Sequence, residues 1–324
     1  MNVPEIILFC LLVLGLGWLV IRLLFPVRGW SCLTLHAGLC YLSGIAILSA
    51  TVTTMSLLGM PLTALSLGLG LTGWSVLLGA VGLGVRAPRQ LLPRYVPPRR
   101  SFERLVGSVL VVAAGFAIVC AIVQSQNLEA AAPHGHWDGV AIWNYHARII
   151  YHAGVHAVAT GASWSHVDYP LLLPAATAGG WTLLGRTDPA VPQLIACGFM
   201  VACFLVLHGI LTLAQRPWHG LLAVIVLAAT RGFIFESAAQ QADVPLAAYM
   251  LSAVGCASLS LILPAGRGRW LALAGLNAAP RPGRKMKASL FSSSWLPRRS
   301  WPCFSRTERG MRASRCSASV PARF

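Results

Sequence analysis

Long runs of apolar residues separated by short polar intervals dominate the chain. The runs that reach or approach the length of a membrane-spanning helix, about 20 residues, are Ile6–Phe25, Cys32–Leu48, Leu62–Val85, Leu105–Val123, Pro170–Leu184, Val191–Leu213, Leu221–Phe235 and Val244–Leu263. Trp270–Ala279 begins another run that stops short of that length. This pattern predicts an all-α fold, a polytopic transmembrane helical bundle with about eight or nine crossings. Pro170–Leu184 and Leu221–Phe235 are short enough for partial or re-entrant helices.

Composition supports a membrane protein over a soluble one. Of the 324 residues, 56% are hydrophobic and 10% are charged, whereas a soluble domain carries about 25% charged residues. Most of the surface is therefore expected to face lipid, and residues 1–279 are predicted to form one transmembrane domain. The nine cysteines include no CxxC pair and are interpreted as small buried hydrophobic residues.

The interval Arg86–Arg104 sets the expected orientation. It holds six arginines and one acid, Glu103, and such intervals stay in the cytoplasm. The next polar segment, residues 124–169, is then an extracytoplasmic loop of a multi-pass cell-membrane protein. If every later run crosses the membrane, Asp243 lies on the cytoplasmic side, away from this loop. If Pro170–Leu184 or Leu221–Phe235 does not cross, Asp243 returns to the loop side.

The loop contains a candidate amphipathic helix. From Trp137 onward its apolar residues follow helical spacing, and Gly154 is placed to end the helix. Tyr145 and Arg148 fall on one face, and the tryptophans and tyrosines suit a membrane–water interface. We therefore expect a short helix lying on the membrane surface.

Six of the nine histidines lie between His134 and His166, and three interpretations remain open. The first is an exposed polar loop whose histidines bond to water, headgroups or backbone. The second is a divalent metal site built from His134, His136 and a carboxylate, although this spacing is not a specific zinc signature. The third is a catalytic loop without metal.

Two acids stand beside apolar runs. Asp243 opens Val244–Leu263, and Asp168 precedes Tyr169-Pro170. Acids inside membrane-embedded stretches are costly and usually functional, but an aspartate that precedes an apolar run also suits a helix cap at the interface. The sequence leaves both interpretations open for each residue.

Three short motifs carry a family resemblance. They are Trp137-Asp138 near the start of the loop, Asp168-Tyr169-Pro170-Leu171-Leu172-Leu173-Pro174 at its exit, and Ala242-Asp243-Val244-Pro245 before a later helix. In this order they resemble the GT-C superfamily of membrane glycosyltransferases, specifically the bacterial protein-mannosyltransferase-like and aminoarabinose-transferase-like enzymes. The resemblance implies transfer of a sugar from a polyprenyl-phosphate carrier to an extracytoplasmic acceptor, with a lipid-linked sugar donor and membrane lipid as partners.

The resemblance also implies roles for individual residues. Asp138 corresponds to the family's general base, although Gly139 follows it where the family often has a second acid. The family's exit motif, commonly His-Pro-Pro-Leu, corresponds to Asp168-Tyr169-Pro170-Leu171, and its later acid corresponds to Asp243. Asp168, Asp243 and Tyr145 are assigned to substrate binding. Arg148 is the one cation besides histidine in residues 124–169, which makes it the expected partner of the donor phosphate. The alternative function is a non-enzymatic polytopic protein such as a transporter, in which internal repeats are frequent; none is found.

The composition changes abruptly at Pro280. Residues 280–324 hold eleven of the 25 Lys and Arg and one acid, Glu308, so most of the net charge of +16 belongs to this tail rather than to a nucleic-acid-binding surface. One interpretation is a disordered basic tail. The other is a shift of reading frame that truncates the enzyme: taking the third base of each codon with the first two of the next, Met286-Lys287 encodes Glu whatever codons are used. Suitable synonymous codons there also resume an apolar helix.

Overall fold

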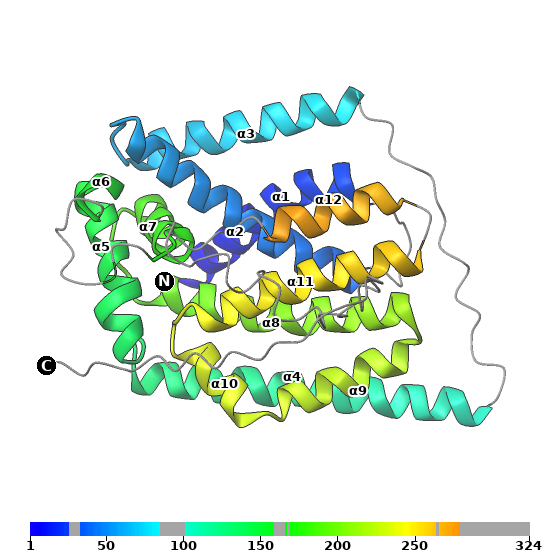
Figure 1. Cartoon of the computed structure of the whole chain (residues 1–324). Helices are drawn as coiled ribbons and strands as arrows, with labels where there is room; N and C mark the ends of the chain where they lie inside the picture. The colour runs from blue at the N-terminus through cyan, green and yellow to red at the C-terminus, as the bar shows by residue number, and fades with distance from the viewer. Residues whose placement is uncertain (26–32, 85–100, 159–165, 167–168, 264–265, 279–324) are drawn as a thin grey trace, which may run out of the picture. The chain divides into compact units, whose positions relative to one another are not determined.

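The computed structural model describes residues 1–25, 33–84, 101–158, 166, 169–263 and 266–278, all within one compact unit, Met1–Lys285. These residues form helices and connecting segments without strands, which confirms the all-α prediction for this part of the chain (Figure 1). The predicted tail, residues 280–324, and Asp168 lie outside the described residues.

Six helices are long and apolar enough to cross a membrane. They are α1 (Val3–Leu24), α2 (Leu33–Leu57), α3 (Ala64–Gly84), α4 (Ser101–Ala131), α8 (Ala190–Ala214) and α11 (Asp243–Ile262). The others are the π-helix η2 (Gly139–Trp143), α5 (Asn144–Ala153), α6 (Val155–Ala157), α7 (Leu172–Leu184), α9 (Pro217–Ala228), α10 (Arg231–Ala238) and α12 (Arg267–Ala278).

The helices α9 and α10 occupy the apolar run Leu221–Phe235 and are bent by 69° at a short break. Counted as one broken span, they bring the described candidates to seven. The expected eight or nine crossings also included Pro170–Leu184 and the run from Trp270, where the structure has α7 and α12, of 13 and 12 residues. At about 1.5 Å per residue both helices are shorter than a 30 Å hydrocarbon core.

Several helix ends gather around α5, and we call this end of the bundle the loop end. There the Met1 amino group bonds to Asp188 Oδ2 at 2.7 Å, and the Val155 N–H donates to Ser56 Oγ, near the end of α2. Gln193, in the first turns of α8, donates to the carbonyl of Pro133, just after α4, at 3.1 Å. The starts of α1 and α8 and the ends of α2 and α4 therefore meet at one end, and Figure 1 shows α5 beside them.

The helix α7 does not run along the spans. Ser49 Oγ on α2 lies 3.5 Å from the carbonyl of Leu171, at the start of α7, and Gly179, in its middle, packs against Leu48 and Val52. Widely spaced points of α7 thus meet one level of α2, so α7 crosses α2. The following helix α8 starts again at the loop end.

The sequence left the side of Asp243 undecided. Because α7 lies across the bundle and α9–α10 returns as a broken span, α11 begins at the loop end, and Asp243 lies there with it.

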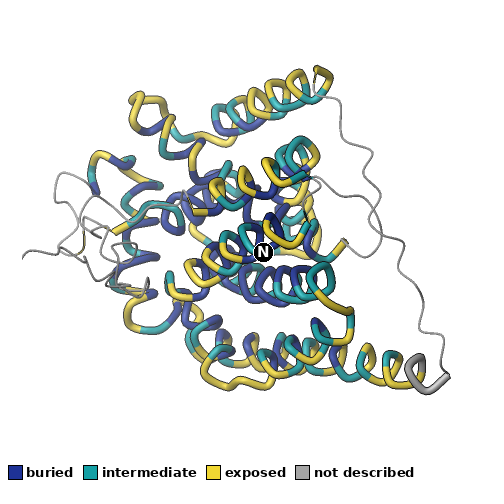
Figure 2. Tube along the Cα trace, turned by 45° about the vertical axis from the view of Figure 1, so that its right-hand side comes forward, coloured by how far each residue is buried: buried dark blue, intermediate teal, exposed yellow. Residues whose placement is uncertain are grey.

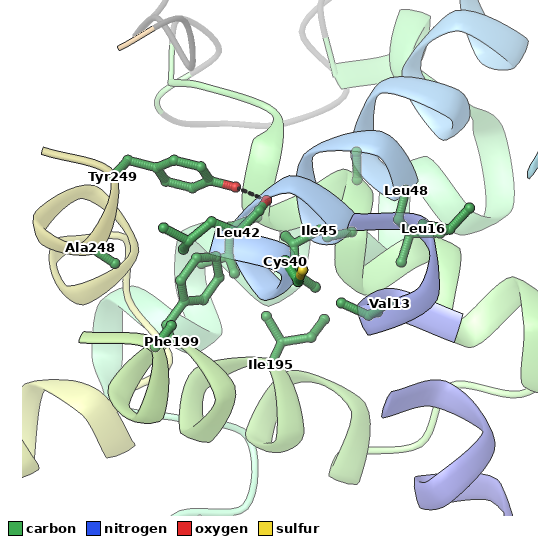
Figure 3. Close-up of a cluster of buried hydrophobic side chains, with 14 of the residues drawn as sticks. Val13, Leu16, Cys40, Leu42, Ile45, Leu48, Ile195, Phe199, Ala248 and Tyr249 are labelled. Carbon is green, nitrogen blue, oxygen red and sulfur yellow. Dashed lines mark hydrogen bonds between the residues drawn. The ribbon is translucent and has the colours of Figure 1, made fainter. Parts of the chain in front are cut away.

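The core lies where α1, α2, α8 and α11 pack together (Figure 3). Val13, Ile45, Ile195 and Phe199 are among its buried side chains, and the hydroxyl of Tyr249 donates to the carbonyl of Leu42 at 2.7 Å. In lipid, helices associate through close packing and such interhelical bonds rather than through the hydrophobic effect. By contrast α3 and α4 are largely exposed (Figure 2), as expected for surfaces in contact with lipid.

Close approach of α1 and α2 depends on glycine. A Cβ added at Gly17 would collide with the carbonyl of Cys40, and one added at Gly44 would collide with the carbonyl of Val13. We expect Gly44→Val to destabilise the bundle by about 1–3 kcal/mol, since backbone atoms have no alternative rotamer. Gly15→Val, on the same helix pair but with no atom within 4 Å of the added Cβ, should leave the melting temperature in detergent unchanged. Equal melting temperatures for the two variants would contradict the helix packing.

Candidate functional site

Asp138 stands at the start of the loop helix. It is exposed, occupies the N-cap position of η2 and makes no capping hydrogen bond there. The helix continues through α5 and ends at Gly154, whose φ of +79° suits glycine, as predicted. The amphipathic helix is thus confirmed, with a π-helical first turn, a feature often found at functional sites.

The segment Pro133–Gly139 packs tightly on the connection between α10 and α11. His136 N–H donates to the carbonyl of Ala239 at 3.2 Å. A Cβ added at Gly139 would lie 2.5 Å from the same carbonyl oxygen, and one added at Gly135 would lie 3.1 Å from Gln240 Cβ. The chain carrying Asp138 therefore touches the chain that leads into Asp243, although the two are about a hundred positions apart in sequence.

Three side-chain amides, from Asn144, Gln193 and Gln240, hold this contact together, and we call them the amide clasp. Asn144 Nδ2 donates to Gln240 Oε1 at 2.8 Å and to the His134 carbonyl at 2.9 Å. Gln240 Nε2 and Gln193 Nε2 both approach the Pro133 carbonyl, at 3.4 and 3.1 Å. Asn144 and Gln240 are 6% and 3% exposed, so the bond between them is made away from water and is costly to break.

Gln240 adopts an unusual backbone conformation. Its φ is +59°, in the left-handed region that costs a non-glycine residue about 1–2 kcal/mol. The surrounding contacts must outweigh this cost. Strain of this kind concentrates at functional sites, where it fixes a particular geometry.

Asp243 is exposed and is the first residue of α11, whose N-cap position belongs to Ala242 and carries no side-chain capping bond. Asp243 lies in the first turn of α11, where a carboxylate suits the positive end of the helix dipole. Asp168 lies outside the described residues, but its neighbour Tyr169 stacks on Trp143 with ring centroids 5.3 Å apart. Trp143, five residues after Asp138, thus contacts the exit motif, and Gly139 contacts the connection that leads into Asp243.

Arg148 and Tyr145 lie further along α5. Arg148 is exposed and Tyr145 is partly exposed, as expected for the outward face of the helix. At 1.5 Å per residue, the backbone of Arg148 is roughly 15 Å from that of Asp138. Within the described residues the side-chain ion pairs are those of Arg186 with Glu5 and Asp188, and Arg148 belongs to none.

The carboxylate of Asp188 is bonded to neighbouring groups of the protein. Its partial burial raises its pKa, but hydrogen bonds from the Met1 amino group and the Ala190 N–H outweigh that effect and hold the pKa below its ordinary value. Arg186 is held by Glu5, whose hydrogen bond raises the pKa of the guanidinium. These charges stabilise the turn between α7 and α8 and are not available to a substrate.

An apolar pocket of about 40 Å³ lies between Trp143, the exit motif and the first turns of α11. It is lined by Trp143, Pro170, Leu172, Leu173, Ala242, Pro245, Leu246 and Tyr249. Every one of these residues belongs to η2, to the exit motif and the start of α7, or to Ala242 and the start of α11. The pocket thus brings an apolar surface next to the polar residues of the loop end.

The histidines show no metal cluster. Among the described residues no three His, Cys, Asp or Glu side chains are grouped so that they could hold a metal ion. The His136 ring instead packs on Phe235 with centroids 4.5 Å apart, and His166 packs on Tyr169 at 4.4 Å.

Sequence reasoning missed several polar residues of this region. It did not single out Asn144, Gln193 or Gln240, because uncharged amides in helices or short connections carry no recognisable signature. It also treated Glu129 as loop, whereas α4 continues to Ala131 and buries this carboxyl at 1% exposure, with Gln126 Nε2 donating to Oε2 at 2.7 Å. The one sequence signal for this residue was an acid six residues after the apolar run Leu105–Val123.

Comparison with models of known families, with curated proteins and with solved structures gives no match for this chain.

Proposed function

We propose that this polytopic membrane protein has the architecture of a membrane glycosyltransferase that transfers a sugar from a polyprenyl-phosphate carrier to an acceptor outside the cytoplasm. The observation that carries the proposal is the contact, at one end of the bundle, between the chain segments next to three motifs that are distant in sequence. Asp138 and Asp243 are both exposed there, on chain segments in direct contact.

The proposed reaction is an inverting displacement. The acceptor hydroxyl gives its proton to the Asp138 carboxylate while its oxygen attacks C1 of the sugar. The bond from C1 to the carrier phosphate breaks, and the phosphate leaves with the electron pair. The distance from Asp138 to Arg148, roughly 15 Å between backbones, leaves room for the sugar and phosphate between the carboxylate and a long guanidinium side chain, which stabilises the leaving phosphate.

The partly open apolar pocket offers a surface against which the first part of the carrier lipid would lie. Its lining is apolar and adjoins Asp243 through Ala242, Pro245 and Leu246. Tyr145, on the outward face of α5 between Asp138 and Arg148, is assigned to sugar contact. Asp168 and Asp243 are assigned to the sugar hydroxyls, since carboxylates accept hydrogen bonds from them.

The direct test is transfer of radiolabelled sugar from polyprenyl phosphate in membranes containing the chain with its frame restored after Ala279. Product that depends on both the chain and the lipid-linked donor supports the proposal. Energy-dependent uptake of a solute by sealed vesicles, without sugar transfer, would favour a transporter instead.

The distribution of charge predicts the orientation. Arginines at the end opposite the loop end include Arg22, Arg216, Arg267 and Arg269, and the helix ends joined by the interval Arg86–Arg104 also lie there. By the positive-inside rule this end is cytoplasmic. A cysteine introduced at Arg94 should be shielded from a membrane-impermeant thiol reagent in intact cells, and one at Thr160 should be labelled. The reverse result would place the loop in the cytoplasm, where the proposed acceptor is absent.

The coding DNA provides a test of the proposed frame shift. Read one frame over from codon 280, it is expected to encode a continuing apolar helix that contains the Glu forced by Met286-Lys287. That helix would lengthen α12, which the structure describes to Ala278, toward a full span. A stop codon or a polar sequence in that frame would identify residues 280–324 as the native tail.

A further inference from the structure

The amide clasp does more than fill the space between helices. Its three members come from α5, α8 and the α10–α11 connection, and each of them bonds to the short segment around Pro133 and His134 or to another member. No other region described by the structure ties the Asp138 segment to the Asp243 segment through side-chain amides.

We propose that Asn144, Gln193 and Gln240 are positioning residues that set the Asp138 carboxylate against the segment carrying Asp243. An effect of these residues on the rate of sugar transfer rests on the proposed function. Their effect on the distance between the two chain segments does not. Gln240 is central because one side chain accepts from Asn144 and donates to the Pro133 carbonyl, while its own carbonyl and that of Ala239 lie against Gly139.

A substitution at Gln240 can distinguish a positioning role from a stabilising one, because of the backbone conformation of this residue. Its φ of +59° is strained for glutamine but is readily adopted by glycine. Gln240→Gly therefore removes the amide and relieves the strain together. The two effects oppose each other in stability, so the melting temperature should shift by no more than about 4 °C. A residue kept only for stability would show no other change.

Geometry is measured by cross-linking in a variant in which all nine cysteines are replaced and Trp137 and Asp243 are changed to cysteine. A short bismaleimide should join the two positions quickly in this background. Adding Gln240→Gly should slow the joining roughly tenfold, because the ends are no longer held at a high effective concentration. Gln241→Ala is the matched control, since Gln241 is the next residue and makes none of the clasp bonds; it should leave the rate unchanged.

Asn144→Asp provides a second variant of nearly the same shape. It removes both Nδ2 bonds and places a carboxylate against Gln240 Oε1 and the His134 carbonyl, so it should slow cross-linking as Gln240→Gly does. In the frame-restored chain with its native cysteines and acids, both variants should lower kcat by on the order of 10²-fold while the KM for the donor stays within about twofold.

Unchanged cross-linking in both variants would overturn the positioning role, whatever happens to the melting temperature. Slower cross-linking together with an intact melting temperature supports it. If the unmodified frame-restored chain transfers no sugar, the proposed function fails, and the cross-linking rates still decide whether the clasp sets the geometry.

Discussion

Asp138→Asn in the frame-restored chain is expected to lower sugar transfer by about 10²–10⁴-fold while leaving membrane insertion intact. The amide cannot accept the acceptor's proton, and this is the usual contribution of a general base. The exposed side chain makes no capping bond, so its replacement by an isosteric amide removes no described structural contact. Transfer from radiolabelled polyprenyl-phosphate sugar measures the effect.

The matched control is Asp188→Asn. This acid bonds to the Met1 amino group and to Arg186, so its loss should weaken the turn between α7 and α8 but leave transfer by the folded fraction near the unmodified rate. Undiminished transfer by Asp138→Asn would remove Asp138 from the mechanism, and equal losses in the two variants would indicate a general defect of folding.

Gly139→Val is expected to disrupt the site by a different route. The added Cβ would lie 2.5 Å from the Ala239 carbonyl, so the two segments must move apart by several tenths of an ångström or more. A shift of this size near reacting groups costs on the order of 10²-fold in rate. The readouts are sugar transfer and the melting temperature of the purified chain.

Gly232→Val serves as its control, because nothing lies within 4 Å of a Cβ at Gly232 although it is in the neighbouring helix α10. This variant should keep near-normal transfer. If Gly139→Val transferred sugar as well as Gly232→Val, the close contact between the loop and the α10–α11 connection would be unnecessary for function.

Hydrophobic pattern alone predicted the all-α membrane fold and the approximate bounds of the long helices, because burial in lipid demands unbroken apolar runs. It also predicted the loop helix and its end at Gly154, since helical spacing and a left-handed glycine are local signals. The course of α7 and of α9–α10 could not be predicted, because a run of intermediate length fits a span, a broken span or a helix lying across the bundle.

The candidate site was predicted only in part for the same reason. The three motifs could be recognised as short strings, but whether Asp243 shares a side with Asp138 depends on how many runs cross between them. The clasp residues depend on tertiary contact: Gln240 and Asn144 become partners only when α10 returns to the loop end. Amides also lack the charge that marks Asp138 or Arg148 in an apolar chain.

The central claim is that Asp138 and Asp243 lie at the same end of the bundle. It is tested most directly with single cysteines at Trp137 and at Asp243 in a cysteine-free chain, treated in intact cells with a membrane-impermeant thiol reagent. The fold predicts that both positions have the same accessibility, and the proposed orientation predicts that both are labelled. Labelling of position 137 with position 243 labelled only after the membrane is permeabilised would place the two acids on opposite sides and contradict the site.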